Sequence, residues 1–284
     1  MKIISTVLSI LDPVRNWRAA ARCVAVLVRH RDLTLEMARR DIRSQYGGQA
    51  LGSWWVVGHP LFLMLVYITV FALIFKVRLG GSIEMPRDYI TYLLSGLVPW
   101  MCAQQALARG PTLMVSQANL VKQVVFPIQV IPAAGVLVNL VFLAVGLAVL
   151  LIYSLITQGS LAVTVILLPI LVLCLIVGLL GISFALAAIG VFFRDLKDVV
   201  QVLVVAGVYM MPIFYLPQWV PKPLKPLMYL NPFSAMGWCF QDAIYFGRFE
   251  HPGAWFAYIL GSILTFAVGY RLFTRLAPNF GNAL

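Results

Sequence analysis

The chain has 284 residues, of which 62% are hydrophobic and 11% charged, and its mean hydropathy is +0.93. A soluble domain is about half apolar and about a quarter charged, which excludes soluble, disordered, collagen-like and disulfide-scaffold classes. The net charge of +11 is expected to orient membrane spans rather than to bind nucleic acid, because Lys and Arg in short loops stay on the cytoplasmic side. The composition predicts an all-α, multi-pass integral membrane protein.

Residues 1–54 form the most strongly charged stretch and are expected to be cytoplasmic or interfacial. Asp12 and Pro13 are typical of the start of a helix. On this helix the basic side chains lie opposite an apolar side: Arg15, Arg18, Arg22 and Arg29 against Trp17, Val24 and Val28. The pattern predicts an amphipathic helix in the membrane interface, the alternative being a helix packed on soluble protein. A second helix, 33–46, is expected to end at Gly47 and Gly48.

Six apolar stretches follow and predict six transmembrane helices: residues 55–75, 89–108, 128–156, 161–193, 199–216 and 255–273. They make up a permease domain, 55–275, followed by a short cytoplasmic tail, 276–284. Pro60 is expected to break the first span near its start. With the N-terminus inside, fifteen Lys and Arg residues fall on the cytoplasmic side and six outside. This asymmetry predicts two cytoplasmic termini.

The stretch between the fifth and sixth spans is rich in proline. Asn231 and Pro232 predict the start of a helix that runs to residue 245 or 246 and is closed by Gly247. About fourteen residues are too few to cross a bilayer, so this helix is expected to be re-entrant or interfacial on the outer face. The alternative, a seventh span, would need an apolar run without these prolines.

Several kinds of chemistry have no counterpart in the sequence. The spans contain almost no ionisable residue, which a proton- or sodium-coupled carrier needs at mid-membrane. The histidines and cysteines have neither partner nor metal-ligand spacing, and no G-x-x-x-x-G-K-[ST] loop is present. We therefore expect no metal site and no enzymatic activity, and a bundle that takes its energy from another polypeptide. Two short cytoplasmic segments, 110–127 and 192–199, are suited to receive it; the alternative is that they are simple interfacial helices.

Four motifs occur in order among these spans: RRDIRSQYGGQALGSWW at 39–55, NLVKQVVFP at 119–127, FRDLKD at 193–198 and LNPF at 230–233. With them the chain resembles the type-2 ABC transporter permeases of the polysaccharide-exporter branch, which export O-antigen, capsular polysaccharide or teichoic acid. The resemblance implies a homodimer in the bacterial inner membrane. Two copies of a separate nucleotide-binding subunit would bind ATP and Mg²⁺, and this chain would hold no cofactor.

The resemblance also implies roles for particular residues. Residues 116–125 would form a coupling helix that docks on the ATPase, flanked by helix 33–46 and the loop 193–198. The expected coupling residues are Ser116, Asn119, Leu120, Val121, Lys122, Arg194 and Asp195. The short helices between spans five and six would be outer gate helices, with Leu224, Tyr229, Asn231, Pro232 and Phe233 as their main residues.

The implied substrate is a lipid-linked glycan. Arg39, Arg40 and Arg43 precede the first span and are placed to attract its pyrophosphate; ordinary anchoring to the membrane is the alternative. A sugar channel is expected to be lined by aromatic rings, and the candidates are Tyr67, Phe71, Tyr209, Phe214 and Tyr215, with plain packing as their alternative. Two other functions stay open: an ABC permease for drugs or other lipids, and a proton-coupled carrier or membrane enzyme.

Overall fold

The computed structural model describes residues 13–46, 52–74, 87–123 and 126–284. The regular elements formed by these residues are all helices. A helix satisfies its backbone hydrogen bonds internally, as a chain surrounded by hydrocarbon requires. Three of the described helices are long and apolar enough to cross a membrane: Val130–Gln158, Val163–Gly190 and Pro252–Asn279. The expected all-helical membrane architecture is therefore confirmed.

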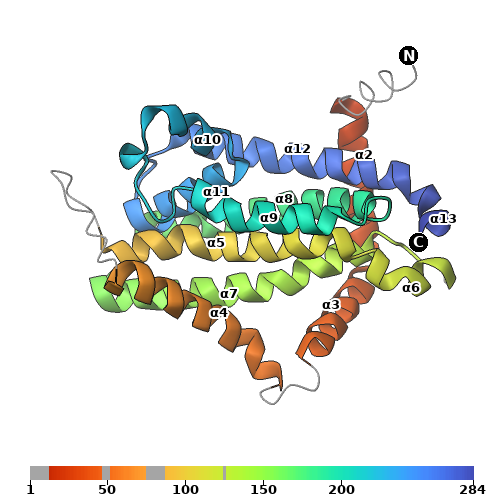
Figure 1. Ribbon diagram of the computed structural model, residues 1–284, viewed down its shortest axis with the longest axis horizontal. Coiled ribbons are helices and arrows are strands. Elements are labelled where there is room, and N and C mark those ends of the chain that lie inside the picture. The colour runs from red at the N-terminus through yellow and green to blue at the C-terminus, as the bar shows by residue number, and fades with distance from the viewer. Residues whose placement is uncertain (1–12, 47–51, 75–86, 124–125) are drawn as a thin grey trace.

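The long helices lie side by side along the longest axis of the molecule (Figure 1). They are α5 (Tyr89–Arg109), α7 (Val130–Gln158), α8 (Leu168–Gly190), α9 (Leu196–Met210) and α12 (Pro252–Leu276). α4 (Trp55–Tyr67), which the π-helical η2 (Ile68–Ile74) continues, packs obliquely against α7. One end of the bundle carries α6 (Ala118–Gln123) and α13 (Phe280–Ala283), and the other carries α10 (Lys225–Leu230). We call these the α6 end and the α10 end.

Pro60 does not break the first apolar helix as expected. α4 continues through it from Trp55 to Tyr67, and the Pro60 ring is buried. A proline inside a membrane helix frees a carbonyl, and neighbouring helices or small local adjustments can satisfy that group, so the helix tolerates it. Residue 75, the predicted end of this span, lies outside the described residues.

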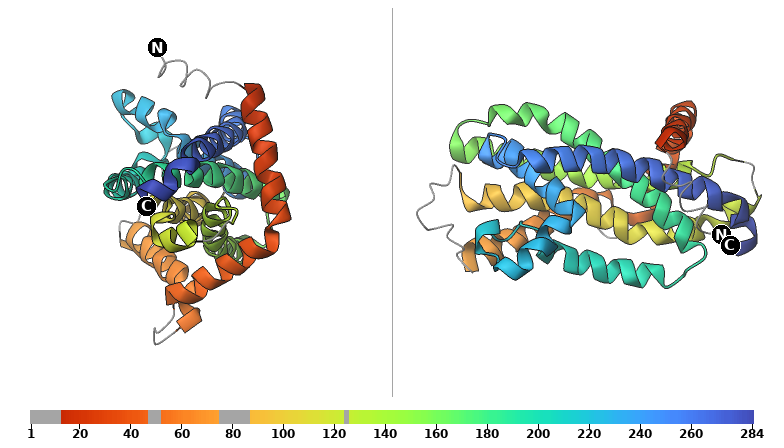
Figure 2. Two further views of the ribbon diagram at one scale, coloured as in Figure 1. Left: turned by 90° about the vertical axis from the view of Figure 1, so that its right-hand side faces the viewer. Right: turned by 90° about the horizontal axis from the view of Figure 1, so that it is seen from above.

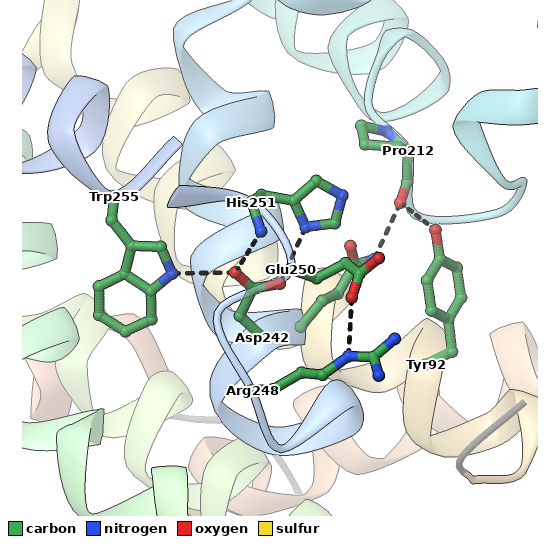
Figure 3. Close-up of polar contacts among 8 residues, drawn as sticks. Tyr92, Pro212, Asp242, Arg248, Glu250, His251 and Trp255 are labelled. Atoms are coloured by element: carbon green, nitrogen blue, oxygen red, sulfur yellow. Dashed lines mark hydrogen bonds and ion pairs between the residues drawn. The ribbon is translucent and has the colours of Figure 1, made fainter. Parts of the chain in front are cut away.

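The helix of the fifth predicted span, 199–216, ends six residues earlier than expected. α9 ends at Met210, and Met211 has an extended backbone because the next residue, Pro212, disfavours a helical conformation before it. The chain then turns inward, and Met211 and Ile213 are completely buried. The Pro212 carbonyl accepts hydrogen bonds from the Tyr92 hydroxyl (2.9 Å) and the Gln241 amide (2.9 Å) (Figure 3). Irregular backbone of this kind is stable at membrane depth only when protein groups satisfy it.

α8 and α12 approach each other closely at two glycines. A Cβ atom on Gly269 would lie 2.0 Å from the Gly181 carbonyl oxygen. In the same way, a Cβ atom on Gly181 would lie 2.4 Å from the backbone of Thr265 and Phe266. Small residues at membrane-helix interfaces let two backbones approach and gain dispersion energy, which replaces the hydrophobic effect inside lipid.

Two helices lie across the α6 end rather than along the bundle, α2 (Pro13–Arg29) and α3 (Arg31–Tyr46) (Figure 2). α2 has one face buried against the bundle, one exposed apolar face and one exposed basic face. The buried face carries Asn16, Ala19 and Cys23, the apolar face Trp17, Val24 and Val28, and the basic face Arg18, Arg22 and Arg29. The helix is thus amphipathic as predicted and also packs against α12. Asp12, Gly47, Gly48 and the side chain of Arg15 lie outside the described part of the chain.

The α10 end is built from short helices. η6 (Pro217–Trp219), η7 (Lys222–Leu224) and α10 lead into α11 (Pro232–Gln241), and the π-helical η8 (Asp242–Phe246) continues α11. The Asn231 side chain accepts a hydrogen bond from the Phe233 backbone N–H at 3.0 Å, which caps α11. Gly247 closes η8 with φ of 68°, a left-handed conformation that suits glycine. Both ends of the predicted helix are therefore confirmed.

Candidate functional site

The predicted coupling segment starts from a tight junction with α8. It begins with the turn η3 (Gly110–Thr112), followed by η4 (Val115–Gln117) and then α6. Pro111 is buried against Gly190 near the end of α8, where a Cβ atom would lie 2.0 Å from the Pro111 carbonyl oxygen. The segment is thereby joined directly to a long helix of the bundle. Residues 124 and 125, the expected end of the coupling helix, are outside the described ranges.

The coupling segment has an exposed polar face and an apolar face that packs against the bundle. Ser116, Asn119 and Lys122 are exposed and lie three residues apart, so they share one side of the segment. Leu120 and Val121 are half-buried and pack on the apolar cluster of the α6 end, which includes Phe280. Of the predicted coupling residues in this segment, three are thus exposed and two are half-buried against the bundle.

α3 is tied to the coupling segment by polar side chains. The Arg40 guanidinium donates to the Gln117 side-chain oxygen of that segment (3.2 Å), and Arg109, the last residue of α5, donates to Gln45 of α3 (3.4 Å). A cavity of about 450 Å³ lies between these elements. Arg39 and Arg43 are exposed on α3. Arg40 thus reaches towards the coupling segment from the same helix.

Arg194 and Asp195 are exposed in the turn between α8 and α9. The Asp195 backbone carbonyl accepts from the Val199 N–H at 3.2 Å, which starts α9. Because Gly190 packs on Pro111, this turn follows directly from the junction that holds the coupling segment. Both predicted coupling regions consequently extend from the same corner of the α6 end.

The five predicted channel aromatics are brought together in one cluster. The Phe71 and Phe214 rings are stacked with centroids 4.2 Å apart, and Tyr67 lies 5.6 Å from Phe214. Tyr209 lies 5.8 Å from Phe214, and the Tyr215 hydroxyl donates to the Tyr209 carbonyl at 3.0 Å. Phe214 is buried, whereas Tyr209 is 62% exposed on α9. The cluster joins η2 and α4 to the irregular segment after α9 and presents Tyr209 outward.

The predicted gate residues comprise one half-buried residue that packs on the bundle, Phe233, and an exposed edge. The Phe233 ring meets Trp100 of α5 edge-on at 5.3 Å, which seats the start of α11 in the bundle. Leu224 and Tyr229 are exposed, and Tyr229 also packs on Trp238 at 5.2 Å. Asn231 and Pro232 form the capped start of α11 described above. One side of the short helices thus packs against the bundle, and the other side is exposed.

A buried carboxylate at the α10 end is a feature that the sequence did not suggest. Asp242, 1% exposed, accepts hydrogen bonds from the His251 backbone N–H (2.9 Å), the His251 ring Nδ1 (2.8 Å) and the Trp255 indole N–H (2.9 Å) (Figure 3). The expectation that the histidines lack partners is wrong for His251, because the loop 247–250 folds it back onto η8. This cluster ties η8 to the start of α12. Among the described residues no group of three potential metal ligands occurs.

A second polar cluster joins α5 to α7 at the same end. Asp88 accepts from the Tyr153 hydroxyl (2.8 Å) and from the Gln158 amide (3.1 Å). Arg87 donates to the Ser154 hydroxyl at 2.9 Å. Partial burial lowers the pKa of the Arg87 guanidinium, and the neighbouring Asp88 carboxylate opposes that shift. These contacts hold two bundle helices together at the α10 end, beside the short helices.

The comparisons with known proteins agree with this arrangement. The ABC-2 type transporter family profile matches residues 33–245. An O-antigen export system permease protein RfbA of Klebsiella pneumoniae is 25% identical over 257 residues, covering 89% of this chain and 95% of that protein. The protein of the same name from Myxococcus xanthus is 25% identical over 265 residues, covering 93% and 99%. With its apolar helices and this match over most of its length, the chain belongs to the ABC-2 type transporter family and is a multi-pass membrane permease that works with an ABC ATPase subunit.

Proposed function

We propose that this chain is the permease subunit of an ATP-driven exporter that moves a lipid-linked cell-surface polysaccharide, of the O-antigen or capsular type, across the bacterial inner membrane. The observation that carries the proposal is the family match together with two full-length relatives named as O-antigen export permeases. The aromatic cluster around Phe214 supports it, because sugar rings stack on flat apolar faces.

The proposed topology has six spans, α4 with η2, α5, α7, α8, α9 and α12, with the α6 end in the cytoplasm. The surplus of Lys and Arg in the segments at that end supports the orientation. Both termini are then cytoplasmic, residues 1–54 form the cytoplasmic and interfacial region, and 276–284 form the tail. α9 has only fifteen residues, about 22 Å of helix, so the buried segment after it must complete the fifth span.

In this topology the exposed face of Ser116, Asn119 and Lys122 docks on the ATPase, flanked by Arg194 and Asp195. Two copies of the ATPase bind ATP and Mg²⁺, and their movement reaches the bundle through the contact of Pro111 with Gly190. A second copy of the permease pairs across the exposed apolar side of α9, which carries Val202, Leu203 and Val205. Tyr209 on that side would face the channel between the copies.

The outer gate is formed by α10 and α11 acting as re-entrant helices. The contact of Phe233 with Trp100 fixes them to the bundle. Their exposed edge, with Leu224 and Tyr229, borders the outer opening of the channel. At the cytoplasmic side Arg39 and Arg43 bind the pyrophosphate of the lipid carrier by charge-assisted hydrogen bonds. Arg40 serves the same site from its position beside Gln117.

The docking proposal is tested by pulling the ATPase down with the permease. Lys122→Glu combined with Asn119→Trp reverses one charge and adds bulk on the exposed face without touching the half-buried Leu120 and Val121. We expect co-purified ATPase to fall at least tenfold. Lys222→Glu, the same charge change at an exposed position of the α10 end, is the control. Unchanged co-purification of the double variant would rule out this face as the docking surface.

The substrate is tested in a host that lacks the gene. We expect surface polysaccharide to disappear while its lipid-linked precursor accumulates inside, and the wild-type chain to reverse both effects. Complementation together with an ATPase inactivated in its phosphate-binding loop should not restore the surface polymer. If both glycan pools stay normal in the deletion strain, the cargo is a drug or another lipid.

A further inference from the structure

A groove of about 490 Å³ lies beneath the elbow at which α2 meets α3. Val28 of α2 and Leu35 of α3 line it from above. Leu137 of α7, Val177 of α8 and Phe266 of α12 line it from below. These three floor helices are the described helices that are long and apolar enough to cross a membrane. The groove is therefore a gap between a crosswise surface helix and the membrane-spanning part of the bundle.

The lining of this groove is almost entirely apolar, with Thr34 and Arg31 as its polar members. An apolar gap of this kind at the flank of a membrane bundle is open to hydrocarbon. The exposed face of α2 beside it, with Trp17, Val24 and Val28, is also apolar. Water in such a space would make few hydrogen bonds, whereas an acyl chain would gain dispersion contacts with both the elbow and the floor.

Among the described residues, the one charged residue that lines the groove is Arg31. The Arg31 side chain is 76% exposed, and Asp32, its neighbour at 3.8 Å, is 89% exposed, so their ion pair is weak in water. Further basic side chains, Arg18, Arg22 and Arg29, lie exposed on the neighbouring basic face of α2, outside the lining of the groove. Residues 13–46 contain eight arginines and three acidic residues. An occupant with an anionic head and an apolar tail matches this combination of charge and lining.

We propose that the groove binds an anionic phospholipid, with its phosphate at Arg31 and one acyl chain between the α2–α3 elbow and α7, α8 and α12. The choice of the cytoplasmic leaflet rests on the proposed orientation of the permease. A second copy of the chain is not the occupant, because α9, its proposed partner surface, lies on the opposite flank of the bundle from α2 (Figure 2). The bound lipid fills the space under α2 and holds this helix against the bundle.

The experiment uses the full-length permease, purified with its ATPase and stripped of lipid in detergent. Phosphatidylglycerol and phosphatidylcholine with identical acyl chains are titrated, and bound lipid is counted by native mass spectrometry. We expect about one phosphatidylglycerol per chain to bind in preference to phosphatidylcholine. Arg31→Gln should weaken this binding roughly tenfold or more, the scale of a lost charge-assisted hydrogen bond. Arg31→Lys should retain most of it.

Two further variants make the test specific. Leu137→Trp fills the groove and should displace the lipid while the head-group charge stays in place. Lys222→Gln removes one charge at the α10 end and should leave binding unchanged. The proposal is overturned if Arg31→Gln binds phosphatidylglycerol like the wild type, or if a polyprenyl phosphate displaces phosphatidylglycerol and is itself displaced by Leu137→Trp. The measurement needs neither transport nor glycan, so its failure would leave polysaccharide export untouched, and a failure of export would leave the lipid site standing.

Discussion

The contact between α8 and α12 makes a sharp prediction, because it depends on the absence of one side-chain carbon. Gly269→Ala would place a methyl group 2.0 Å from the Gly181 carbonyl oxygen, on backbone that cannot rotate away. Ordinary van der Waals contact begins at about 3.4 Å. The two helices must therefore separate locally by about 1.4 Å.

A separation of this size has a large energetic effect. A gap of about 0.5–1 Å already removes a quarter to a half of the dispersion energy of each contact that it opens. Forcing extra carbon into a packed core typically costs about 1–3 kcal/mol, and the backbone position of this clash puts the cost at the upper end, about 3 kcal/mol. For a chain of this size, that corresponds to a fall in melting temperature of roughly 6–12 °C.

The matched control lies on the same helix. A Cβ atom on Gly261 of α12 would meet nothing within 4 Å. We expect Gly261→Ala to melt within about 1–2 °C of the wild type, as measured by the thermal unfolding of purified protein in one detergent. Equal melting temperatures for Gly269→Ala and the wild type would refute the reasoning, since the glycine contact would then not hold α8 to α12.

Three further predictions concern other parts of the chain. Gly190→Ala should push Pro111 out of its junction, because its Cβ atom would lie 2.0 Å from the Pro111 oxygen; we expect ATPase binding to persist and export to fall at least tenfold, with Gly281→Ala as the unaffected control. Asp242→Ala should lower stability by about 3 kcal/mol, because it removes the carboxylate that accepts from the buried donors of His251 and Trp255; a wild-type melting temperature would contradict this. Burial raises the pKa of the Cys23 thiol to about 12, so a maleimide at pH 7.4 should not label it in the folded protein; rapid labelling would show that α2 does not pack as described.

The sequence predicted those features that local chemistry specifies. Asn231, Pro232 and Gly247 are typical cap residues, and their effect depends only on neighbouring backbone, so the bounds of α11 with η8 followed from them. The apolar lengths of α7, α8 and α12 likewise followed from composition. Pro212 was an equally local signal for the end of α9, but it lies in an apolar run that concealed the break.

Other features depend on contacts between distant parts of the chain. The channel candidates follow from the expected role of aromatic rings beside sugars, whereas the stacking of Phe71 on Phe214 could not be predicted. Asp242 and His251 are nine residues apart and meet only because the intervening loop folds back. The glycines of α8 and α12 are plain in the sequence, yet nothing in it says that Gly181 faces Gly269.

The central claim is that this permease moves a lipid-linked glycan by means of its partner's ATP hydrolysis. The most direct test uses inside-out inner-membrane vesicles that contain the permease, its ATPase and radiolabelled lipid-linked glycan. The account predicts that ATP makes the glycan resistant to an added glycosidase within minutes, and that a non-hydrolysable ATP analogue does not. Glycan that stays fully accessible with ATP, in vesicles in which the complex is intact and hydrolyses ATP, would contradict it.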